Sequence, residues 1–325
     1  MKTIHTLPIT DWLRYCRAFI TVMVLLPVAS TSAQPANDFT RIAYNQPSQI
    51  VDLGVGLWAW PFPVHHNDVD LIDLMVVCTD KPYWGTYIFH NSGHINPTTG
   101  LPVFHPAVRI GPAASNPQVT YQEEGPVAMN LNQVYPDFLK TGFRDPVALP
   151  VSRTVHIPEK DAPVFRIRGN HWRFVDYDGN GVDDIVVGIG YWGDYGWDNA
   201  YNDSGEWTNG PIRGYVYLIR NAGSNENPRY GEPEKLTAGG EPIDVFGSPV
   251  PNFADFDGDG DLDLLCAEFI DGFTYFENVG TRENPEYAGG RVLSALGHPV
   301  ETELCMIIPV AYDFDGDGDP DLVVG

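Results

Sequence analysis

Three short segments of the chain place acidic side chains at every second position around a glycine. The segment at 255–263 reads DFDGDGDLD, and similar segments occur at 176–184 and 313–321. In each segment, side chains that carry oxygen stand at positions one, three, five and nine, with glycine at position six. Carboxylates crowded on one turn repel one another unless a hard cation neutralises them. Ca²⁺ takes six to eight oxygen ligands at roughly 2.3–2.6 Å, so this spacing predicts a calcium loop.

The side chains at positions one, three, five and nine are the predicted ligands, together with the backbone carbonyl at position seven. We therefore expect three structural Ca²⁺ ions, one in each acidic loop. The predicted metal ligands are Asp176, Asp178, Asn180, Val182 and Asp184 in the first loop, Asp255, Asp257, Asp259, Asp261 and Asp263 in the second, and Asp313, Asp315, Asp317, Asp319 and Asp321 in the third.

An EF-hand is the closest alternative metal loop, and it needs a bidentate glutamate at position twelve and a helix on each side. Position twelve is Val187, Cys266 or Val324. Each loop is also followed by a short run of Val, Ile and Leu, which is typical of a buried strand. An acidic surface turn is the other alternative, but three loops with the same alternation favour a metal. The loops are therefore predicted to join β-strands.

A second candidate site is the segment 190–213, which is long for a connection between strands. Its aromatic rings could stack on the C–H faces of sugars while neighbouring amides and carboxylates bind the hydroxyl groups. They could also pack on one another as the core of a compact loop, or contact a protein. The sequence leaves these three alternatives open. The candidate substrate-binding residues are Tyr191, Trp192, Tyr195, Trp197, Tyr201 and Trp207.

A catalytic role would require a more specific set of side chains. A polysaccharide lyase needs a base for the proton beside a uronate carboxylate, a cation for that carboxylate and an acid for the leaving oxygen. His171, Tyr195 and Arg213 are the candidates, with ordinary loop residues as the alternative. The sequence contains no nucleophile elbow, phosphate loop or nucleotide fingerprint. It therefore leaves enzymatic activity open, with β-elimination as the reaction to consider.

The elements around the acidic loops repeat along the chain. Each of the first two loops is followed by an apolar strand and then by an aromatic-rich strand, at 214–221 or 273–278. A turn with the pattern Asn-x-Gly…Asn-Pro comes next, and Asn, Gly and Pro favour tight turns. Each repeat thus predicts four strands: one before the loop, one after it, the aromatic strand and an outer strand.

An earlier repeat, at 73–97, has the same strands and turn but lacks the acidic loop. Aligning Asp73 with position nine places His65, Asn67 and Val69 at positions one, three and five. Too few anionic oxygens remain, so no Ca²⁺ is predicted there. A long connection at about 112–170 separates this repeat from the next one and is expected on the same face as the aromatic segment.

The acidic loops and the turn pattern together resemble FG-GAP/VCBS repeats, the family whose blades also form the head of integrin α-subunits. Over roughly residues 50–325, this resemblance implies an all-β fold: a calcium-braced β-propeller of four-stranded antiparallel blades. Blades are expected at about 51–125, 165–248 and 250–305, with a fourth from about 306. Such propellers usually have about seven or eight blades, so we expect an N-terminal fragment of a longer protein.

The overall charge limits the partners. The chain carries 43 acidic and 19 basic residues, for a formal net charge of −24. Nucleic acids and anionic membranes favour clusters of Lys and Arg, so neither is an expected partner.

The N-terminal 33 residues have the pattern of a signal peptide, followed by a lead-in at 34–50. Basic residues precede an apolar run at 18–28, which is too short to span a bilayer core of roughly 30 Å. The protein is therefore expected to be secreted or periplasmic.

These expectations combine into one functional hypothesis. The chain is a secreted calcium-binding propeller that binds carbohydrate, with an acidic polysaccharide as one candidate ligand. Some bacterial polysaccharide lyases are similar in fold, which is an analogy and not evidence of catalysis. The alternative is a non-catalytic adhesion module with an extracellular protein ligand.

Overall fold

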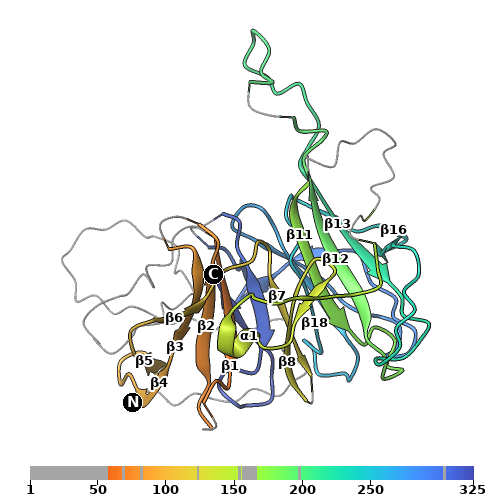
Figure 1. The fold of residues 1–325 in the computed structure, drawn as a ribbon. Coiled ribbons are helices and arrows are strands. Elements are labelled where there is room, and N and C mark those ends of the chain that lie inside the picture. The colour runs from red at the N-terminus through yellow and green to blue at the C-terminus, as the bar shows by residue number, and fades with distance from the viewer. Residues whose placement is uncertain are drawn as a thin grey trace, which may run out of the picture.

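The computed structural model describes residues 58–67, 70–80, 83–122, 124–152, 155, 167–196, 199–302 and 305–325. The predicted signal peptide and the lead-in at 34–50 lie outside these residues. Within them, four antiparallel sheets of four or more strands are arranged like the blades of a propeller (Figure 1). The predicted all-β propeller fold is confirmed.

Three of the sheets correspond to the sequence repeats, and each has its strands in the predicted order. The first blade contains β1 (Ala59–Val64), β2 (Asp73–Cys78), β3 (Gly85–Phe89) and β6 (Val108–Gly111). The second contains β11 (Ile167–Val175), β12 (Asp184–Tyr191), β13 (Arg213–Ile219) and β14 (Glu234–Lys235), and β17 (Asp244–Val245) also pairs with β13. The third contains β18 (Pro251–Ala254), β19 (Asp263–Ala267), β20 (Phe273–Phe276) and β21 (Arg291–Val292).

Four further strand pairs complete the described repeats. Three of them are short hairpins: β4 (Asn91–Ile95) with β5 (Pro102–Phe104), β15 (Thr237–Ala238) with β16 (Glu241–Pro242), and β22 (Ser294–Ala295) with β23 (His298–Pro299). The fourth pair, β24 (Pro309–Tyr312) with β25 (Asp321–Val324), flanks the third acidic loop. It contacts β18 through β24 and β1 through both strands, so the first and last units described lie side by side.

The fourth sheet lies within 112–170, the segment expected to be a long connection between two blades. It is formed by β7 (Gln118–Gln122), β8 (Gly125–Asn130), β9 (Gln133–Tyr135) and β10 (Val147–Ala148), with the short helix α1 (Phe138–Thr141) between the last two strands. The segment has neither the acidic loop nor the Asn-x-Gly turn, so nothing in the repeat pattern pointed to a sheet. The expected loop is therefore partly a blade-like sheet that contacts β11 through β7 and β8.

Hydrophobic cores fill the spaces between neighbouring sheets, as expected for a propeller. Val175, Val216 and Leu264 belong to a core between the second and third blades. Another core joins the second blade to the β7–β10 sheet, and a third joins the first blade to the β24–β25 pair. Burial of these side chains contributes roughly 1.5–3 kcal/mol for each large aliphatic or aromatic residue.

Strand β12 shows how closely the second and third blades approach each other. All eight of its residues are buried, which agrees with its continuous run of Val and Ile. A methyl group added at Gly188 would lie 2.3 Å from the carbonyl oxygen of Pro249, which is far inside contact distance. Glycine is therefore required at this position for the blades to pack.

A polar cluster crosses the buried interior between four of the units. The Arg173 guanidinium of β11 donates hydrogen bonds to Gln118 Oε1 of β7 at 2.9 Å and to Asn252 Oδ1 of β18 at 2.8 Å. Asn252 also donates to the Pro309 carbonyl of β24 at 3.0 Å and accepts from the Ala311 N–H at 3.1 Å. One buried amide thus connects the second blade, the third blade and the last strand pair.

Candidate functional site: acidic loops and a projecting hairpin

Each acidic loop joins the first and second strands of its unit, as predicted. The loops run from β11 to β12, from β18 to β19 and from β24 to β25. Position nine is the first residue of the second strand each time: Asp184, Asp263 or Asp321. This aspartate is almost completely buried in all three units. The strands therefore hold one carboxylate rigidly at the base of each loop.

The position-one carboxylate shapes the rest of the loop. Asp255 Oδ1 accepts the backbone N–H groups of Gly258 and Asp259 at 2.7 and 3.1 Å, and Asp255 Oδ2 accepts that of Gly260 at 3.0 Å. Gly260 has a φ of 96°, a conformation that side chains other than glycine strongly disfavour. The glycine at position six is therefore needed for the turn.

Carboxylate oxygens converge in two of the three loops. Ligand atoms of Asp255, Asp257 and Asp259 lie within 4.8 Å of one another, and so do those of Asp313, Asp315 and Asp321. The pKa of Asp263 and the pKa of Asp321 are each raised to about 7, and burial of the carboxyl group is the largest cause. A negative charge on these two aspartates, at the base of their loops, is thus unfavourable unless a cation compensates it. The residues present fit a hard divalent cation that prefers oxygen ligands.

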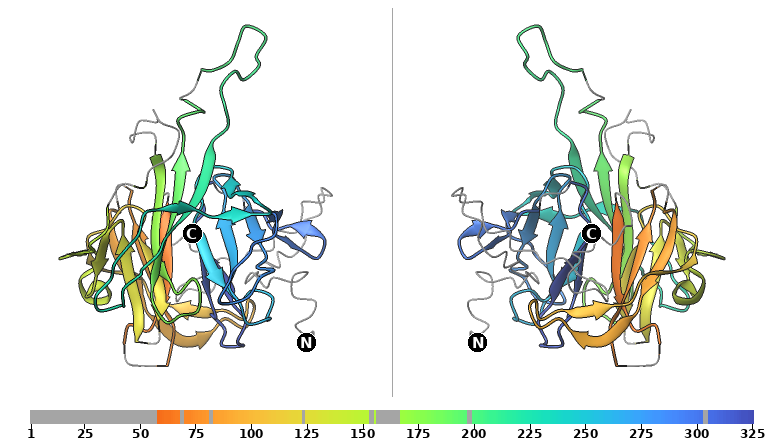
Figure 2. Two further views of the ribbon diagram at one scale, coloured as in Figure 1. Left: turned by 90° about the vertical axis from the view of Figure 1, so that its right-hand side faces the viewer. Right: turned by 90° about the vertical axis from the view of Figure 1, so that its left-hand side faces the viewer.

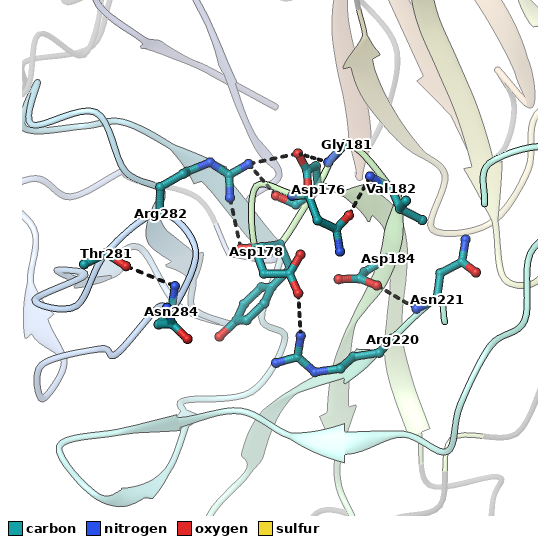
Figure 3. Close-up of polar contacts among 12 residues, drawn as sticks. Asp176, Asp178, Gly181, Val182, Asp184, Arg220, Asn221, Thr281, Arg282 and Asn284 are labelled. Carbon is teal, nitrogen blue, oxygen red and sulfur yellow. Dashed lines mark hydrogen bonds and ion pairs between the residues drawn. The ribbon is translucent and has the colours of Figure 1, made fainter. Parts of the chain in front are cut away.

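The first acidic loop differs because arginines contact two of its carboxylates (Figure 3). Arg220 Nη1 lies 3.2 Å from Asp178 Oδ2, and Arg282 Nη2 lies 3.4 Å from Asp176 Oδ2. Arg282 also donates to the carbonyl oxygens of Asp176 and Tyr177. Since Arg282 belongs to the turn of the third blade, the first loop is partly neutralised by a neighbouring blade.

Even in this first loop, one carboxylate oxygen is placed so that it could bind a cation. The Asp184 side chain is buried, and its Oδ2 has no hydrogen-bond partner among the described residues. Burial is also the largest cause that raises the Asp184 pKa to about 6. The first loop therefore keeps one carboxylate that a cation could compensate, although its other two carboxylates contact arginines.

The position-nine aspartate also explains the turn pattern in the sequence. Its Oδ1 accepts the backbone N–H of the turn asparagine, from Asn221 to Asp184 at 2.6 Å and from Asn278 to Asp263 at 2.8 Å. In the first blade, Asn91 donates to Asp73 in the same way at 2.7 Å. The alignment of Asp73 with position nine is therefore confirmed by its hydrogen bond.

The aromatic segment forms a long hairpin that projects from the second blade (Figures 1 and 2). It leaves the end of β12 and returns at the start of β13, whereas the acidic loop precedes β12. The hairpin and the loop are thus at opposite ends of β12, as strand order predicted. Near the tip, Tyr201 and Trp207 form an isolated antiparallel bridge.

Most of the aromatic rings in the hairpin pack on one another or on the blades. Tyr195 stacks on Trp207 with ring centroids 4.6 Å apart, and Tyr201 meets Trp207 edge-on at 5.2 Å. Tyr201 is the exposed member of this cluster, with 64% of its surface accessible. These three rings therefore make the contacts expected if the aromatic residues pack on one another as the core of a compact loop.

The two aromatic residues at the base of the hairpin are buried. Trp192 packs edge-on against Phe269 of the third blade at 4.9 Å, and the Arg168 guanidinium lies 4.6 Å from the centre of its ring. Tyr191 is the last residue of β12 and is 4% exposed. Trp197 lies outside the described residues. Phe269 and Arg168 were not anticipated, because no repeat pattern relates them to the hairpin.

The three catalytic candidates occupy different environments, and one of them, Tyr195, is the ring that stacks on Trp207 in the hairpin. His171 is completely buried in β11, where its Nδ1 lies 3.3 Å from Gln118 Nε2 and its Nε2 lies 3.2 Å from Ser248 Oγ. Arg213 forms ion pairs with Asp244 at 2.6 Å and with Asp194 at 3.6 Å. A general base must reach its substrate, and the burial of His171 gives no support for that role.

The burial of His171 leads to a prediction about acid stability. Desolvation, followed by the nearby Arg173 charge, lowers the His171 pKa from 6.5 to about 3. As the pH falls below 6.5, the unfolded chain takes up a proton that the folded chain does not, so stability is lost. Each pH unit in this range costs about 1.4 kcal/mol. The free energy of unfolding, measured with urea, should therefore fall less steeply between pH 7 and 4.5 in His171→Gln than in wild type.

The matched control for this prediction is His94→Gln, which replaces an exposed histidine. Its unfolding free energy should follow the wild-type pH dependence. Parallel curves for wild type and His171→Gln would contradict the assignment.

Comparison with known proteins identifies one part of the chain. Residues 255–324 match the family model described as FG-GAP-like repeat. This match covers the second acidic loop, strands β19–β21 of the third blade and the third acidic loop, so the resemblance predicted from the sequence is confirmed there. No curated protein sequence and no solved structure matches the chain. Among the described residues, no helix is both long enough and apolar enough to cross a bilayer.

Proposed function

We propose that this chain is a calcium-binding β-propeller module that is exported from the cytoplasm and binds an extracellular ligand. The observation that carries the proposal is the FG-GAP-like repeat at 255–324, whose two acidic loops each bring three carboxylates together. In this proposal the ions are structural. They hold the first two strands of a unit together at one end and leave the opposite end free for recognition.

Calcium is proposed first for the loops at 255–263 and 313–321. Both offer converging carboxylate oxygens, and Ca²⁺ is the common divalent cation with this ligand preference. The loop at 176–184 is the weaker third site, because Arg220 and Arg282 already contact its carboxylates. These arginines would have to share or release Asp178 and Asp176 for the loop to bind an ion as the other two do.

The projecting hairpin is the proposed ligand-binding element. Long ordered connections on a rigid scaffold are common positions for binding residues. Its exposed aromatic ring, Tyr201, lies among polar residues such as Asn202 and Glu206, which suit a sugar with hydroxyl groups on its edge. The segment 190–213 contains four acidic residues and one arginine. Repulsion from these charges favours a neutral carbohydrate over an acidic polysaccharide.

A protein ligand is the second candidate, and the packing of the hairpin favours it. Because Tyr195 and Trp207 stack on each other, each ring covers one face of the other and leaves less ring surface for a sugar. Rigid aromatic residues are frequent anchors in protein interfaces. Lyase activity receives no support from the environments of His171 and Arg213, so the proposed module binds without catalysing a reaction.

Affinity electrophoresis can test the hairpin assignment and separate the ligand classes. Migration of the protein should be retarded in gels that contain a neutral polysaccharide such as dextran or xyloglucan, and less so with polygalacturonate. Tyr201→Ala should weaken the retardation at least about fivefold, since loss of one stacked aromatic ring costs about 1 kcal/mol or more. Tyr83→Ala is the matched control, because Tyr83 is also exposed but lies in the first blade.

Equal retardation of wild type and Tyr201→Ala would contradict a carbohydrate site on the hairpin. Absence of retardation across neutral and acidic polysaccharides would favour the protein ligand. Trp192→Ala is not a suitable test, because Trp192 is buried and its loss would disturb the contact with Phe269.

A further inference from the structure

The first blade lacks an acidic loop, yet it brings three side chains that can bind a metal to the same end of its strands. His66 precedes β2 in the loop that replaces the acidic one, Asp73 is the first residue of β2, and His90 follows β3. One ligand atom from each lies within 4.8 Å of the other two. The first blade thus has a mixed nitrogen and oxygen cluster where the other units have carboxylates.

The hydrogen bonds around His66 prepare one nitrogen for a metal. His66 Nε2 lies 2.8 Å from the Leu139 carbonyl of α1. A carbonyl oxygen only accepts, so Nε2 carries the ring proton and Nδ1 has the free lone pair. A histidine that binds a metal usually donates its other N–H to a carbonyl or carboxylate in this way. The contact between the first blade and α1 therefore orients His66 Nδ1 as a ligand.

Asp73 is held in a similar manner. Its Oδ1 accepts the Asn91 N–H at 2.7 Å, and its Oδ2 lies 3.1 Å from His90 Nδ1. Because Asp73 is only 2% exposed, the backbone fixes one oxygen while the other faces the histidine. In a tetrahedral zinc site, two ligand atoms are about 3.3 Å apart. The distance between Asp73 Oδ2 and His90 Nδ1 is close to this value.

The Asn67 amide lies between the two histidines. Its Oδ1 is 3.3 Å from His66 Nδ1, and both atoms are acceptors when Nε2 carries the proton. Its Nδ2 is 3.0 Å from His90 Nδ1. Asn67 stands at loop position three, which is Asp178, Asp257 and Asp315 in the acidic loops. The cluster therefore shares positions three and nine with the acidic loops, through Asn67 and Asp73, whereas His66 stands at position two and His90 follows β3.

We propose that His66, Asp73 and His90 form a binding site for a divalent transition-metal ion, with Zn²⁺ as the best-fitting candidate. Imidazole nitrogen suits Zn²⁺ and similar metals, whereas Ca²⁺ requires more oxygen ligands than this cluster has. The ion binds the two imidazoles and one Asp73 oxygen and leaves a fourth position for water or the Asn67 amide.

Calorimetric titration of the full chain with ZnCl₂ in excess CaCl₂ tests the proposal, because calcium occupies the acidic loops. We expect one Zn²⁺ for each chain. His66→Ala and His90→Ala should each weaken binding by at least about tenfold, the lower limit for disturbing a metal site. His65→Ala is the matched control: His65 is the neighbouring exposed histidine and lies outside the cluster. Its affinity for Zn²⁺ should equal that of wild type.

Two further measurements make the result decisive. Circular dichroism without zinc shows whether the His66 and His90 variants are folded, so that lost binding is not lost structure. Co²⁺ used in place of Zn²⁺ should give the visible absorption of a tetrahedral nitrogen and oxygen site in wild type and not in His90→Ala. The proposal is overturned if wild type and the folded His66→Ala variant bind Zn²⁺ equally, or if His65→Ala causes the same loss.

Discussion

Removal of calcium with EGTA should lower the melting temperature of the protein by roughly 10 °C. A ligand that binds only the folded state stabilises it by about 2.7 kcal/mol for each site at 100 times its Kd, or roughly 5 kcal/mol for two sites. Each kcal/mol shifts the melting temperature of a large domain by about 2–4 °C. The physical reason lies in the loops, where converging and partly buried carboxylates repel one another without an ion. Differential scanning calorimetry with and without EGTA measures the shift.

Single substitutions assign this effect to particular loops. Asp257→Asn removes one of the converging carboxylates of the second loop with little change in shape, and it should remove about half of the EGTA shift. Asp203→Asn is the control, since Asp203 is an exposed hairpin residue remote in sequence from the loops. If EGTA left the melting temperature of wild type unchanged, the structural role of calcium would be excluded. In that case the zinc site would still be tested by His66→Ala and His90→Ala against His65→Ala, because these residues lie outside the acidic loops.

Replacement of Asn252 by alanine should lower the free energy of unfolding by about 2–3 kcal/mol, because it removes a hydrogen bond to a buried charge and leaves buried groups unpaired. The amide oxygen of Asn252 accepts from Arg173 and from the Ala311 N–H, and its nitrogen donates to the Pro309 carbonyl. Without it, the buried Arg173 guanidinium keeps only the contact with Gln118 among the hydrogen bonds of the described residues. Unfolding in guanidinium chloride, followed by tryptophan fluorescence, measures the loss.

The double variant Arg173→Met with Asn252→Leu tests the cause of that loss. It removes the buried charge together with its partner, so it should be more stable than Asn252→Ala alone. Asn227→Ala replaces an exposed asparagine and should change stability by less than about 0.5 kcal/mol. If the double variant were less stable than Asn252→Ala, packing and not the uncompensated charge would explain the effect of Asn252.

The acidic loops show how much local sequence can determine. Alternating aspartates with glycine at position six require one backbone path, because Asp255 binds the N–H groups of the turn and Gly260 adopts a positive φ. The Asn-x-Gly turn could likewise be read from the sequence, since the asparagine side chain bonds to the glycine N–H two residues later. Both features depend on contacts within a few residues and were predicted correctly.

Other features of the fold and of the candidate site depend on contacts between segments that are distant in the sequence. The sheet of β7–β10 has no repeat signal, and its strands form because they cover the second blade and complete the core around it. Arg282 neutralises a loop about 100 residues earlier in the chain, which no local pattern could show. The exposure of each hairpin ring also depends on packing, because Trp192 meets the third blade whereas Tyr201 does not.

The sequence by itself determined the repeat, the order of strands within a blade, the acidic loops and the end of the strand at which each loop lies. These properties follow from hydrogen bonds and side-chain periodicity over short stretches of chain. Tertiary structure alone decided that the acidic loops are not equivalent, that His171 is buried, and that His66, Asp73 and His90 meet beside α1. The physical reason is that burial and charge balance depend on neighbours in space, and most of those neighbours are far away in the sequence.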